Sequence, residues 1–402
     1  MKMPNQMYIG EWTINYLCFT KPINAYKTPI IFLGGAFQTF KSLAHEVEQL
    51  SKDAPVYLVD LPGQGGNSQC ATDLTFEDYS NLLKVFLDNL GIDSCSIIAQ
   101  SYSSIIAYNF ASLYPERTKK VVIGGATSKI RDSVRHLLEE SLHQLAKDKL
   151  ERFASGLVLN MMNFSQRHHI TGARELNAVL YKSILNFSDA DKLRYRDNFS
   201  RLMEHKGLPR APQCPVLVIS GEFDNFTTPF ENFQVAKGCA QSTCVVVKGA
   251  DHLATFEKKD VLTRLYRRYI TDQPLNRMKD VEVIEKNEFP RERIRMEPRW
   301  LLNDVGFLDS GNGVFVPVNI VDINNFGCRL YTSFKDHKSL KRSHKFLLHI
   351  PGEDLQMETI LFKQADNGHY RGIFQHQCFD GTRKFEGFID KVSTTCSTAY
   401  CA

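Results

Sequence analysis

The chain has 402 residues, more than one compact core of ordinary size accommodates, so we expect two domains. Hydrophobic residues make up 43% and charged residues 23% of it, a balance typical of globular proteins rather than of disordered chains. The formal net charge of +4 is small for this length and gives no general case for nucleic acid or a membrane surface as a partner.

The first residues, MKMPNQMYIGEW, lack the apolar core of a signal peptide, and no stretch approaches the roughly 20 apolar residues of a membrane span. The ten cysteines are scattered without a CxxC pair, which argues against zinc ribbons and thioredoxin-type redox sites. Neither a phosphate-binding G-x-x-x-x-G-K-[ST] loop nor a dinucleotide-binding G-x-G-x-x-G follows a strand. We therefore expect a cytoplasmic protein with reduced thiols, no metal and no cofactor.

Short apolar runs between Met7 and Ile270 predict the strands of a mostly parallel sheet. They are rich in β-branched residues and apolar throughout, as is typical of strands buried on both faces. Helical patterns with apolar residues at spacings of three and four separate them, for example over 76–90. This alternation predicts an α/β domain over residues 1–271. The runs are PIIFL (29–33), VYLV (56–59), CSIIA (95–99), VVI (121–123), VLVIS (216–220) and CVVVK (244–248).

The remaining segments break this alternation. Residues from about 131 to 206 contain only helical patterns rich in Leu, Met and Phe, which is typical of a cap over an active site; an ordinary helical subdomain is the alternative. Residues 272–290 are charged and bounded by proline, which indicates a linker. From 291 to about 395, short strands separated by turn residues predict a second, small antiparallel β-barrel domain.

Ser101 follows the predicted strand 95–99 and precedes a helical pattern, IIAYNFASLY. Such a junction is a nucleophile elbow, in which a sharp turn lifts the serine hydroxyl above the carboxyl edge of the sheet. Ala99 and Ser103 stand where the G-x-S-x-G pattern has glycines, and both are small enough to avoid a clash. Small-x-Ser-x-small is common by chance, so the hypothesis depends on the partners of the serine.

An acid and a base follow Ser101 in the chain order serine, acid, histidine, which accompanies a nucleophile elbow. A serine nucleophile needs a base within hydrogen-bond reach and a carboxylate that orients the base. Asp224 lies in the loop after strand 216–220 and His252 in the loop after strand 244–248, so both reach the carboxyl edge. Asp251 is a poor acid because neighbouring side chains point in different directions. We predict Ser101, Asp224 and His252 as a catalytic triad, with a structural role as the alternative for His252.

The oxyanion hole of such an enzyme needs two backbone N–H donors. Tyr102, the residue after the nucleophile, is the first predicted donor. The second is expected from the loop GGAF at 34–37, whose glycines allow close approach of the backbone. We predict Ala36 for this role, with Phe37 as the alternative.

Residues 7–270 resemble the α/β-hydrolase superfamily, and within it the hydroxyalkanoyloxyalkanoate synthases of the rhamnolipid pathway. The matching stretches are GGAF, VDLP, AQSYSS and DNFTTPFENFQ. The resemblance implies an acyltransferase or thioesterase that takes 3-hydroxyacyl groups from acyl carrier protein or coenzyme A and passes them to a hydroxyl or to water. Triads of this kind serve many reactions, so a carboxylesterase or lactonase and a non-catalytic sensor or docking protein are the alternatives.

The C-terminal part resembles a PilZ domain, a receptor for cyclic di-GMP. Two arginines form an R-x-x-x-R pair, and the run DINNFG at 322–327 is close to the family's [DN]-x-S-x-x-G. Arginine binds phosphate groups and guanine edges bidentately. Asparagine stands where serine is usual, so a PilZ fold that has lost its ligand is the alternative. The resemblance implies cyclic di-GMP as a regulatory ligand, bound by Arg291, Arg295, Asp322, Asn324 and Gly327.

Overall fold

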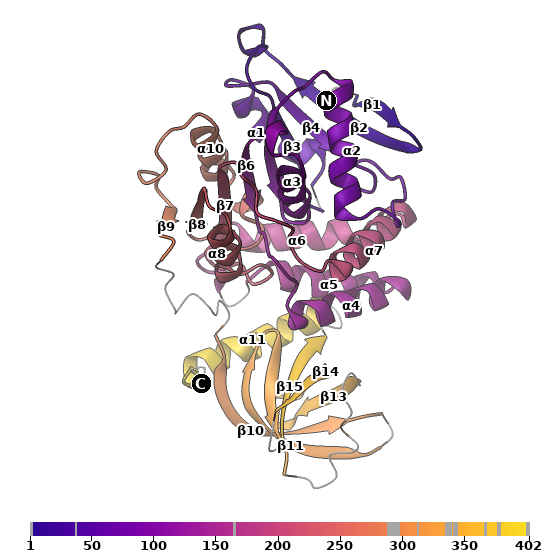
Figure 1. The fold of residues 1–402 in the computed structure, drawn as a ribbon. Helices are drawn as coiled ribbons and strands as arrows, with labels where there is room; N and C mark the ends of the chain where they lie inside the picture. Colours follow the sequence, from indigo (N-terminus) through magenta and orange to yellow (C-terminus); the bar gives the residue numbers. More distant parts are fainter. Residues whose placement is uncertain are drawn as a thin grey trace. The chain divides into compact units, whose positions relative to one another are not determined.

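The computed structural model describes residues 3–36, 38–163, 166–287, 298–311, 313–333, 340, 345–365, 368–375 and 379–398 (Figure 1). The chain forms two compact units. The first comprises Met1–Ile130, His169–Thr171 and Phe187–Ile294, and the second comprises Arg131–His168, Gly172–Asn186 and Arg295–Ala402.

The first unit is built on a sheet whose described strands follow the order β1-β2-β4-β3-β5-β6-β7-β8-β9. Strands β3 to β8 are parallel to one another, and β1, β2 and β9 are antiparallel additions at the edges. The predicted mostly parallel sheet is therefore confirmed. The strands are β1 (Asn5–Ile9), β2 (Trp12–Phe19), β3 (Ile30–Leu33), β4 (Val56–Asp60), β5 (Cys95–Gln100), β6 (Thr118–Gly124), β7 (Val216–Gly221), β8 (Ser242–Val247) and β9 (Val281–Ile284).

Three of these strands, β1, β2 and β9, differ from the sequence-based expectation. Every residue of β3, β5 and β7 is buried, which explains why their apolar runs were easy to recognise. The antiparallel strands β1 and β2 are only partly buried and were not predicted. Strand β9 lies within the charged segment 272–290, whose composition indicated a linker.

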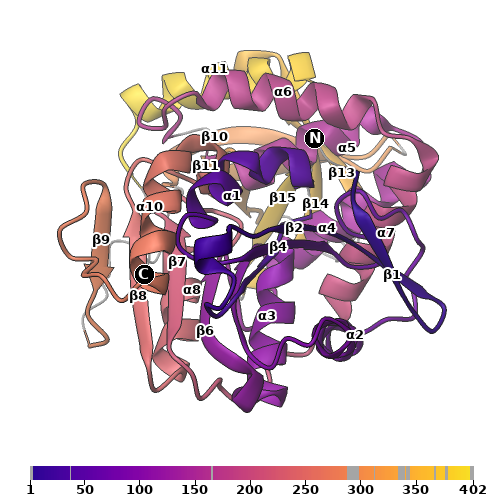
Figure 2. The same ribbon diagram turned by 90° about the horizontal axis from the view of Figure 1, so that it is seen from above.

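Helices cover both faces of this sheet (Figure 2). On one face α1 (Ala44–Leu50) packs against α10 (Lys259–Ile270), and on the other α2 (Phe76–Asn89) packs against α3 (Tyr102–Leu113). The buried side of α10, with Leu262, Leu265 and Tyr266, joins one core cluster with residues of α1, β3 and β4. The remaining helices of this unit are α7 (Asp189–Glu204), α8 (Pro229–Gly238) and α9 (Ala254–Glu257).

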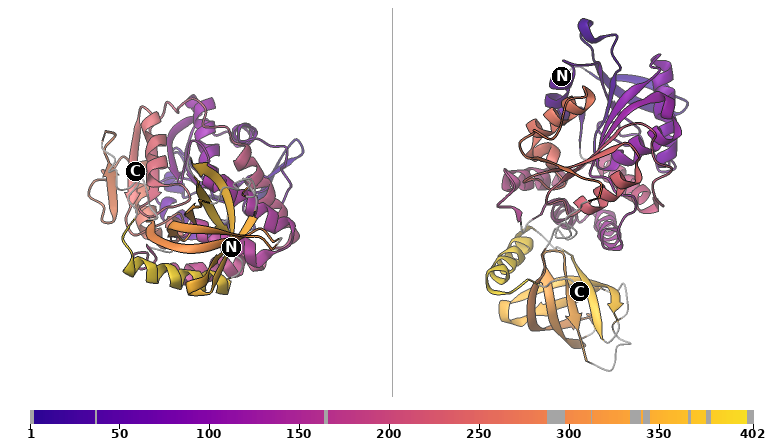
Figure 3. Two further views of the ribbon diagram at one scale, coloured as in Figure 1. Left: turned by 90° about the horizontal axis from the view of Figure 1, so that it is seen from below. Right: turned by 60° about the vertical axis from the view of Figure 1, so that its left-hand side comes forward.

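The second unit combines three helices of the segment between β6 and β7 with an antiparallel barrel (Figure 3). The helices are α4 (Asp132–Ala146), α5 (Leu150–Met161) and α6 (Ala173–Leu185). The described strands close in the order β10-β11-β12-β15-β14-β13, which confirms the predicted small antiparallel barrel. The strands are β10 (Trp300–Asp309), β11 (Phe315–Asn324), β12 (Gly327–Tyr331), β13 (Lys345–Ile350), β14 (Leu355–Ala365) and β15 (His369–Gln375).

A helix that was not predicted, α11 (Phe379–Thr395), follows the last barrel strand and lies over one end of the barrel (Figure 3). Its residues Phe385, Phe388, Ile389 and Val392 are buried in the barrel core. Their spacing of three and four places them on one face of the helix. Across the described residues, no helix is long and apolar enough to cross a membrane.

Candidate active site

Ser101 occupies a sharp turn between β5 and α3. Its φ of 49° and ψ of −118° lie in a region that residues other than glycine rarely occupy, so the turn is strained. The Ser101 N–H donates to the carbonyl of Gly124 at the end of the neighbouring strand β6, at 2.6 Å. This geometry is that of a nucleophile elbow, with the serine at the carboxyl edge of the sheet.

The two residues that replace the usual glycines, Ala99 and Ser103, are fully buried. The Ser103 hydroxyl donates to the carbonyl of Gly34, at 2.6 Å, in the loop that follows β3. The next residue, Ser104, donates its hydroxyl to the carbonyl of Gly124 at 2.8 Å. Glycine at position 103 could not form the first bond. The serine therefore ties the first turn of α3 to the loop that carries Ala36.

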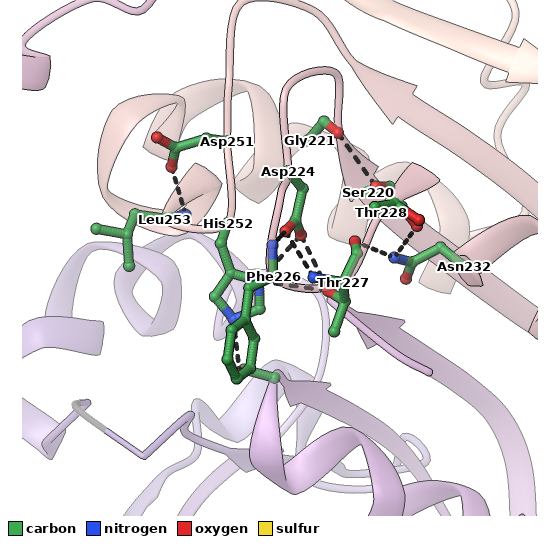
Figure 4. Close-up of polar contacts among 12 residues, drawn as sticks. Ser220, Gly221, Asp224, Phe226, Thr227, Thr228, Asn232, Asp251, His252 and Leu253 are labelled. Carbon is green, nitrogen blue, oxygen red and sulfur yellow. Dashed lines mark hydrogen bonds and ion pairs between the residues drawn. The ribbon is translucent and has the colours of Figure 1, made fainter. Parts of the chain in front are cut away.

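The side chains of Ser101, His252 and Asp224 form a chain of hydrogen bonds. The Ser101 Oγ lies 2.8 Å from Nε2 of His252. On the other side of the ring, Nδ1 of His252 lies 2.9 Å from Oδ2 of Asp224 (Figure 4). The side chains of His252 and Asp224 are each only 1% exposed. With the Nδ1 proton donated to Asp224, Nε2 can accept the proton of Ser101. The structure thus brings together the three residues that chain order singled out.

The Asp224 carboxylate is held by donors of its own loop (Figure 4). Its Oδ1 accepts the N–H groups of Phe226 and Thr227 at 2.9 and 2.8 Å, and its Oδ2 accepts the Thr227 hydroxyl at 3.0 Å. These bonds fix the carboxylate oxygen that faces His252. Sequence reasoning missed Thr227. The sequence signal for this role was a hydroxyl-bearing residue three positions after Asp224.

Asp251, which we rejected as the acid, has a different role. Its Oδ1 accepts the N–H of Leu253 at 2.9 Å, and its own N–H donates to Oε2 of Glu257 at 2.9 Å. In Figure 4 its carboxylate points away from His252. Burial, the charge of Asp251 and a hydrogen bond between the two side chains raise the pKa of Glu257 to about 10, so Glu257 is protonated at neutral pH.

The environment of His252 favours its protonated form. Burial acts to lower the pKa of the imidazole, but the charge of Asp224, the hydrogen bond to it and the charge of Asp251 outweigh burial, so the pKa is raised.

The ring of His252 fits against Gly125, whose φ is +64°. A Cβ at that position would lie 2.9 Å from Cε1 of His252, so glycine leaves the space that the ring needs.

The predicted oxyanion donors lie in two segments that approach Ser101. Tyr102 is the first residue of α3, so its N–H has no acceptor within the helix. A Cβ added to Gly35 would lie 3.5 Å from Cβ of Ser101, which shows how closely the loop after β3 approaches. In that loop the carbonyl of Ala36 accepts the Tyr195 hydroxyl at 3.0 Å. The role of the two amides stays a prediction, and Phe37 lies outside the described residues.

The residues predicted to bind cyclic di-GMP lie in the second unit. Arg291 and Arg295 are outside the described residues. Asn324 and Gly327 form the turn between β11 and β12, in which Oδ1 of Asn324 accepts two backbone N–H groups at 3.1 Å. A Cβ on Gly327 would lie 2.1 Å from the carbonyl oxygen of Gly372, so the turn requires glycine there. Both residues therefore have a structural role whether or not a ligand binds.

Asp322 is buried and lies between two arginines. Its Oδ1 is 2.6 Å from Nη1 of Arg299, and its Oδ2 is 3.0 Å from Nε of Arg329. Arg299 was not predicted, although it continues the four-residue spacing of Arg291 and Arg295. Within the described ranges, no group of three or more His, Cys, Asp or Glu side chains is placed to hold a metal ion.

Known proteins resemble the part of the chain that runs from just before β3 to the start of α10. A family model described as the alpha/beta hydrolase fold matches residues 28–259. The chain belongs to this family. The (R)-3-hydroxydecanoyl-ACP:CoA transacylase of Pseudomonas putida is 23% identical over 245 residues, which cover 59% of this chain and 80% of that protein. The poly(3-hydroxyalkanoate) depolymerase of Ectopseudomonas oleovorans is 29% identical over 108 residues, which cover 27% of this chain and 38% of that protein.

Solved structures agree with this assignment. An alpha/beta hydrolase enzyme from a Medee basin deep-sea metagenome library superposes with a TM-score of 0.60 at 22% identity, covering 67% of this chain and 98% of the other. The enol-lactonase of Burkholderia xenovorans gives a TM-score of 0.57 at 19% identity, covering 66% and 100%. The predicted alpha/beta hydrolase fold and the prediction of an enzyme are confirmed.

Replacing Asp224 by Asn should lower kcat by about three to four orders of magnitude, because the amide cannot hold the His252 tautomer that accepts the serine proton. The matched change Asp251→Asn should lower kcat by less than about tenfold, because this side chain faces Leu253 and Glu257. Steady-state kinetics with one acyl ester substrate compares the two variants. Losses of equal size would contradict the assignment of the acid.

The pH dependence should report the raised pKa of His252. The imidazole must be neutral to accept the serine proton, so kcat/KM should rise with pH through a pKa above the ordinary 6.5. Asp251→Asn removes a charge that helps to raise this pKa and should move the rise to lower pH. Profiles of kcat/KM with a substrate that does not titrate measure both effects. A wild-type rise centred at or below 6.5 would contradict this account.

Proposed function

We propose that this protein is a serine-nucleophile acyltransferase acting on 3-hydroxyacyl thioesters carried by acyl carrier protein or coenzyme A. The observation that carries the proposal is the hydrogen-bond chain from Ser101 through His252 to Asp224. Such a chain activates a hydroxyl for attack on an acyl carbon. The names of two distant relatives, a 3-hydroxydecanoyl transacylase and a poly(3-hydroxyalkanoate) depolymerase, support 3-hydroxyacyl chains as the substrate class.

In the first half-reaction Ser101 Oγ attacks the thioester carbonyl carbon while its proton moves to Nε2 of His252. The amides of Ala36 and Tyr102 stabilise the negative charge that develops on the carbonyl oxygen. Collapse of this intermediate breaks the C–S bond, and the departing thiolate takes the proton from His252. The product is a 3-hydroxyacyl ester of Ser101.

In the second half-reaction an acceptor attacks the acyl-enzyme, and His252 takes the acceptor's proton. The hydroxyl of a second 3-hydroxyacyl chain would give a dimeric ester. Water would give the free acid, which is the thioesterase outcome. Ser101 regains its proton from His252 when the ester bond breaks.

Substrate preference tests the proposal. 3-Hydroxydecanoyl-CoA should be used with a kcat/KM at least about 100-fold above that of acetyl-CoA, because each buried methylene group of the chain adds binding energy in the transition state. Mass spectrometry of the products identifies the acceptor, and Ser101→Ala is the control for enzyme-independent hydrolysis. A preference for short acetyl esters would favour a carboxylesterase or lactonase. No turnover and no labelling by a fluorophosphonate probe would favour a non-catalytic protein.

The regulatory part of the proposal concerns the barrel, which binds cyclic di-GMP through the segment that includes Arg291 and Arg295 and through the surroundings of Asp322. Besides the sequence resemblance, the two guanidinium groups at Asp322 support this, because arginine pairs with phosphate oxygens and guanine edges. Arg299 belongs to this set of ligand-binding candidates.

Ion pairs between the barrel and the helices of the same unit support a route for the regulatory signal. Nη1 of Arg152 on α5 lies 2.9 Å from Oε1 of Glu358 on β14. Nζ of Lys345 on β13 lies 2.8 Å from Oε1 of Glu140 on α4. Arg167, which precedes α6, forms ion pairs with α11. Because α4 to α6 connect β6 to β7 along the chain, a ligand that shifts the barrel strands changes a segment that is continuous with the catalytic sheet.

Charge reversal tests this route. Cyclic di-GMP should change kcat/KM of the wild-type enzyme, and Glu358→Arg should reduce that change at least about fivefold while leaving the Kd for cyclic di-GMP unaltered. The double variant Arg152→Glu, Glu358→Arg should restore the response. Glu353→Arg is the matched control, because Glu353 forms its ion pair with Lys391 of α11. No calorimetric binding of cyclic di-GMP to the full chain would leave the barrel as a docking module.

A further inference from the structure

A pocket of about 450 Å³ lies in the first unit, beside the carboxyl end of α10. Five cationic side chains and one carboxylate line it, so this pocket carries the same formal net charge as the entire chain. None of its lining residues is Ser101, Asp224 or His252 or belongs to the loops that carry these three. The charged lining residues are Asp53, Arg264, Arg267, Arg268, Arg277 and Lys279.

One of these cations is neutralised by the carboxylate. Arg267 donates Nε to Oδ2 of Asp53 at 2.6 Å and Nη2 to Oδ1 at 3.2 Å. Arg268 has its Nε buried without a hydrogen-bond partner, as judged within the described ranges. A buried, unpaired guanidinium N–H is costly. The other three cations form no ion pair with any residue that the structure describes, and they are Arg264, Arg277 and Lys279.

The five cationic side chains of the pocket are not explained by stabilisation of the carboxyl end of α10. The last carbonyl groups of α10 already accept hydrogen bonds. The N–H of Thr271 donates to the carbonyl of Arg267, and the N–H of Gln273 donates to that of Arg268. Nζ of Lys120 donates to the carbonyls of Tyr269 and Ile270. Cations near a helix carboxyl end gain about 0.3–1 kcal/mol each from the helix dipole, within the last turn only. Two of the cations come from the separate segment between α10 and β9. Their convergence on the α10 arginines costs repulsion.

The pocket is also distinct from the Ser101 site in the topology of the sheet. Asp53 precedes the first residue of β4, and Ser101 follows the last residue of β5. Strands β4, β3 and β5 are adjacent and parallel, so these two residues lie at opposite edges of the sheet.

We propose that this pocket binds a ligand carrying at least two phosphate groups, of about the size of a nucleoside diphosphate. Guanidinium groups bind phosphate oxygens bidentately and keep their charge when dehydrated. Two or more phosphates would balance the four cations that Asp53 leaves uncompensated. The volume is within the range of small-molecule sites. A free nucleotide and the adenosine diphosphate portion of coenzyme A share this chemistry, and the site does not depend on the proposed function.

Calorimetry on the full chain with pyrophosphate, ADP and coenzyme A as separate probes tests the site. Arg268→Gln and Arg277→Gln should each raise the Kd at least about tenfold, the effect of losing a charge-assisted hydrogen bond. Arg210→Gln, at an exposed arginine of the same unit outside the pocket, should leave the Kd unchanged. Coenzyme A binding at least tenfold more tightly than ADP, with an affinity that Arg277→Gln weakens, would assign the pocket to the acyl carrier. Equal affinities of ADP and coenzyme A that Arg277→Gln weakens alike would assign it to a free nucleotide, and coenzyme A binding that Arg277→Gln leaves unchanged would belong to the Ser101 site and count against the proposal.

Thermal unfolding separates binding from a structural role. Without ligand, Arg277→Gln should leave Tm unchanged or raise it, because the substitution removes a repelled charge. With ADP, Tm should rise for the wild type but not for this variant. Absence of binding by all three probes, or equal loss of affinity in Arg210→Gln and Arg277→Gln, would overturn the proposal. A fall in Tm for ligand-free Arg277→Gln would also overturn it, since the arginine would then serve the fold.

Discussion

The backbone turn at Ser101 is the constraint on which the candidate active site depends. A non-glycine residue at this φ and ψ costs about 1–3 kcal/mol and persists only where the surroundings determine it. Here the Ser101 N–H is held by β6, and the buried hydroxyl of Ser103 holds the first turn of α3 to the loop after β3. Because parallel strands share one carboxyl edge, the loops after β7 and β8 deliver Asp224 and His252 to the same place.

The carboxylates of Asp224 and Asp251 are both buried near His252, and they would compete for the proton on its Nδ1 if their surroundings were alike. The Asp224 carboxylate accepts bonds from its own loop and faces Nδ1 of His252. The Asp251 side chain instead caps a turn and is paired with protonated Glu257. Local hydrogen bonding therefore gives the imidazole one orienting partner, although the second acid is its neighbour in the chain. Both charges still contribute to the raised pKa of His252.

Much of the first unit could be predicted because its signals are local in sequence. Continuous apolar runs marked the central strands, and chain order marked Ser101, Asp224 and His252. Strand β9 was hidden because its segment is charged, and α11 because its apolar residues are spaced along an otherwise polar stretch. Thr227 and Arg299 gain their roles only from contacts that the fold creates. The cationic pocket could not be predicted from the sequence either, because the fold brings together its residues from three separate segments.

The central claim is that Ser101 carries a 3-hydroxyacyl group during turnover. Mass spectrometry of the full chain, quenched with acid within the first turnovers on 3-hydroxydecanoyl-CoA, tests it most directly. The account predicts a mass increase equal to one 3-hydroxydecanoyl group, located on Ser101 by peptide mapping and missing in Ser101→Ala. Turnover by the Ser101→Ala variant at the wild-type rate, or an adduct on another side chain, would contradict it.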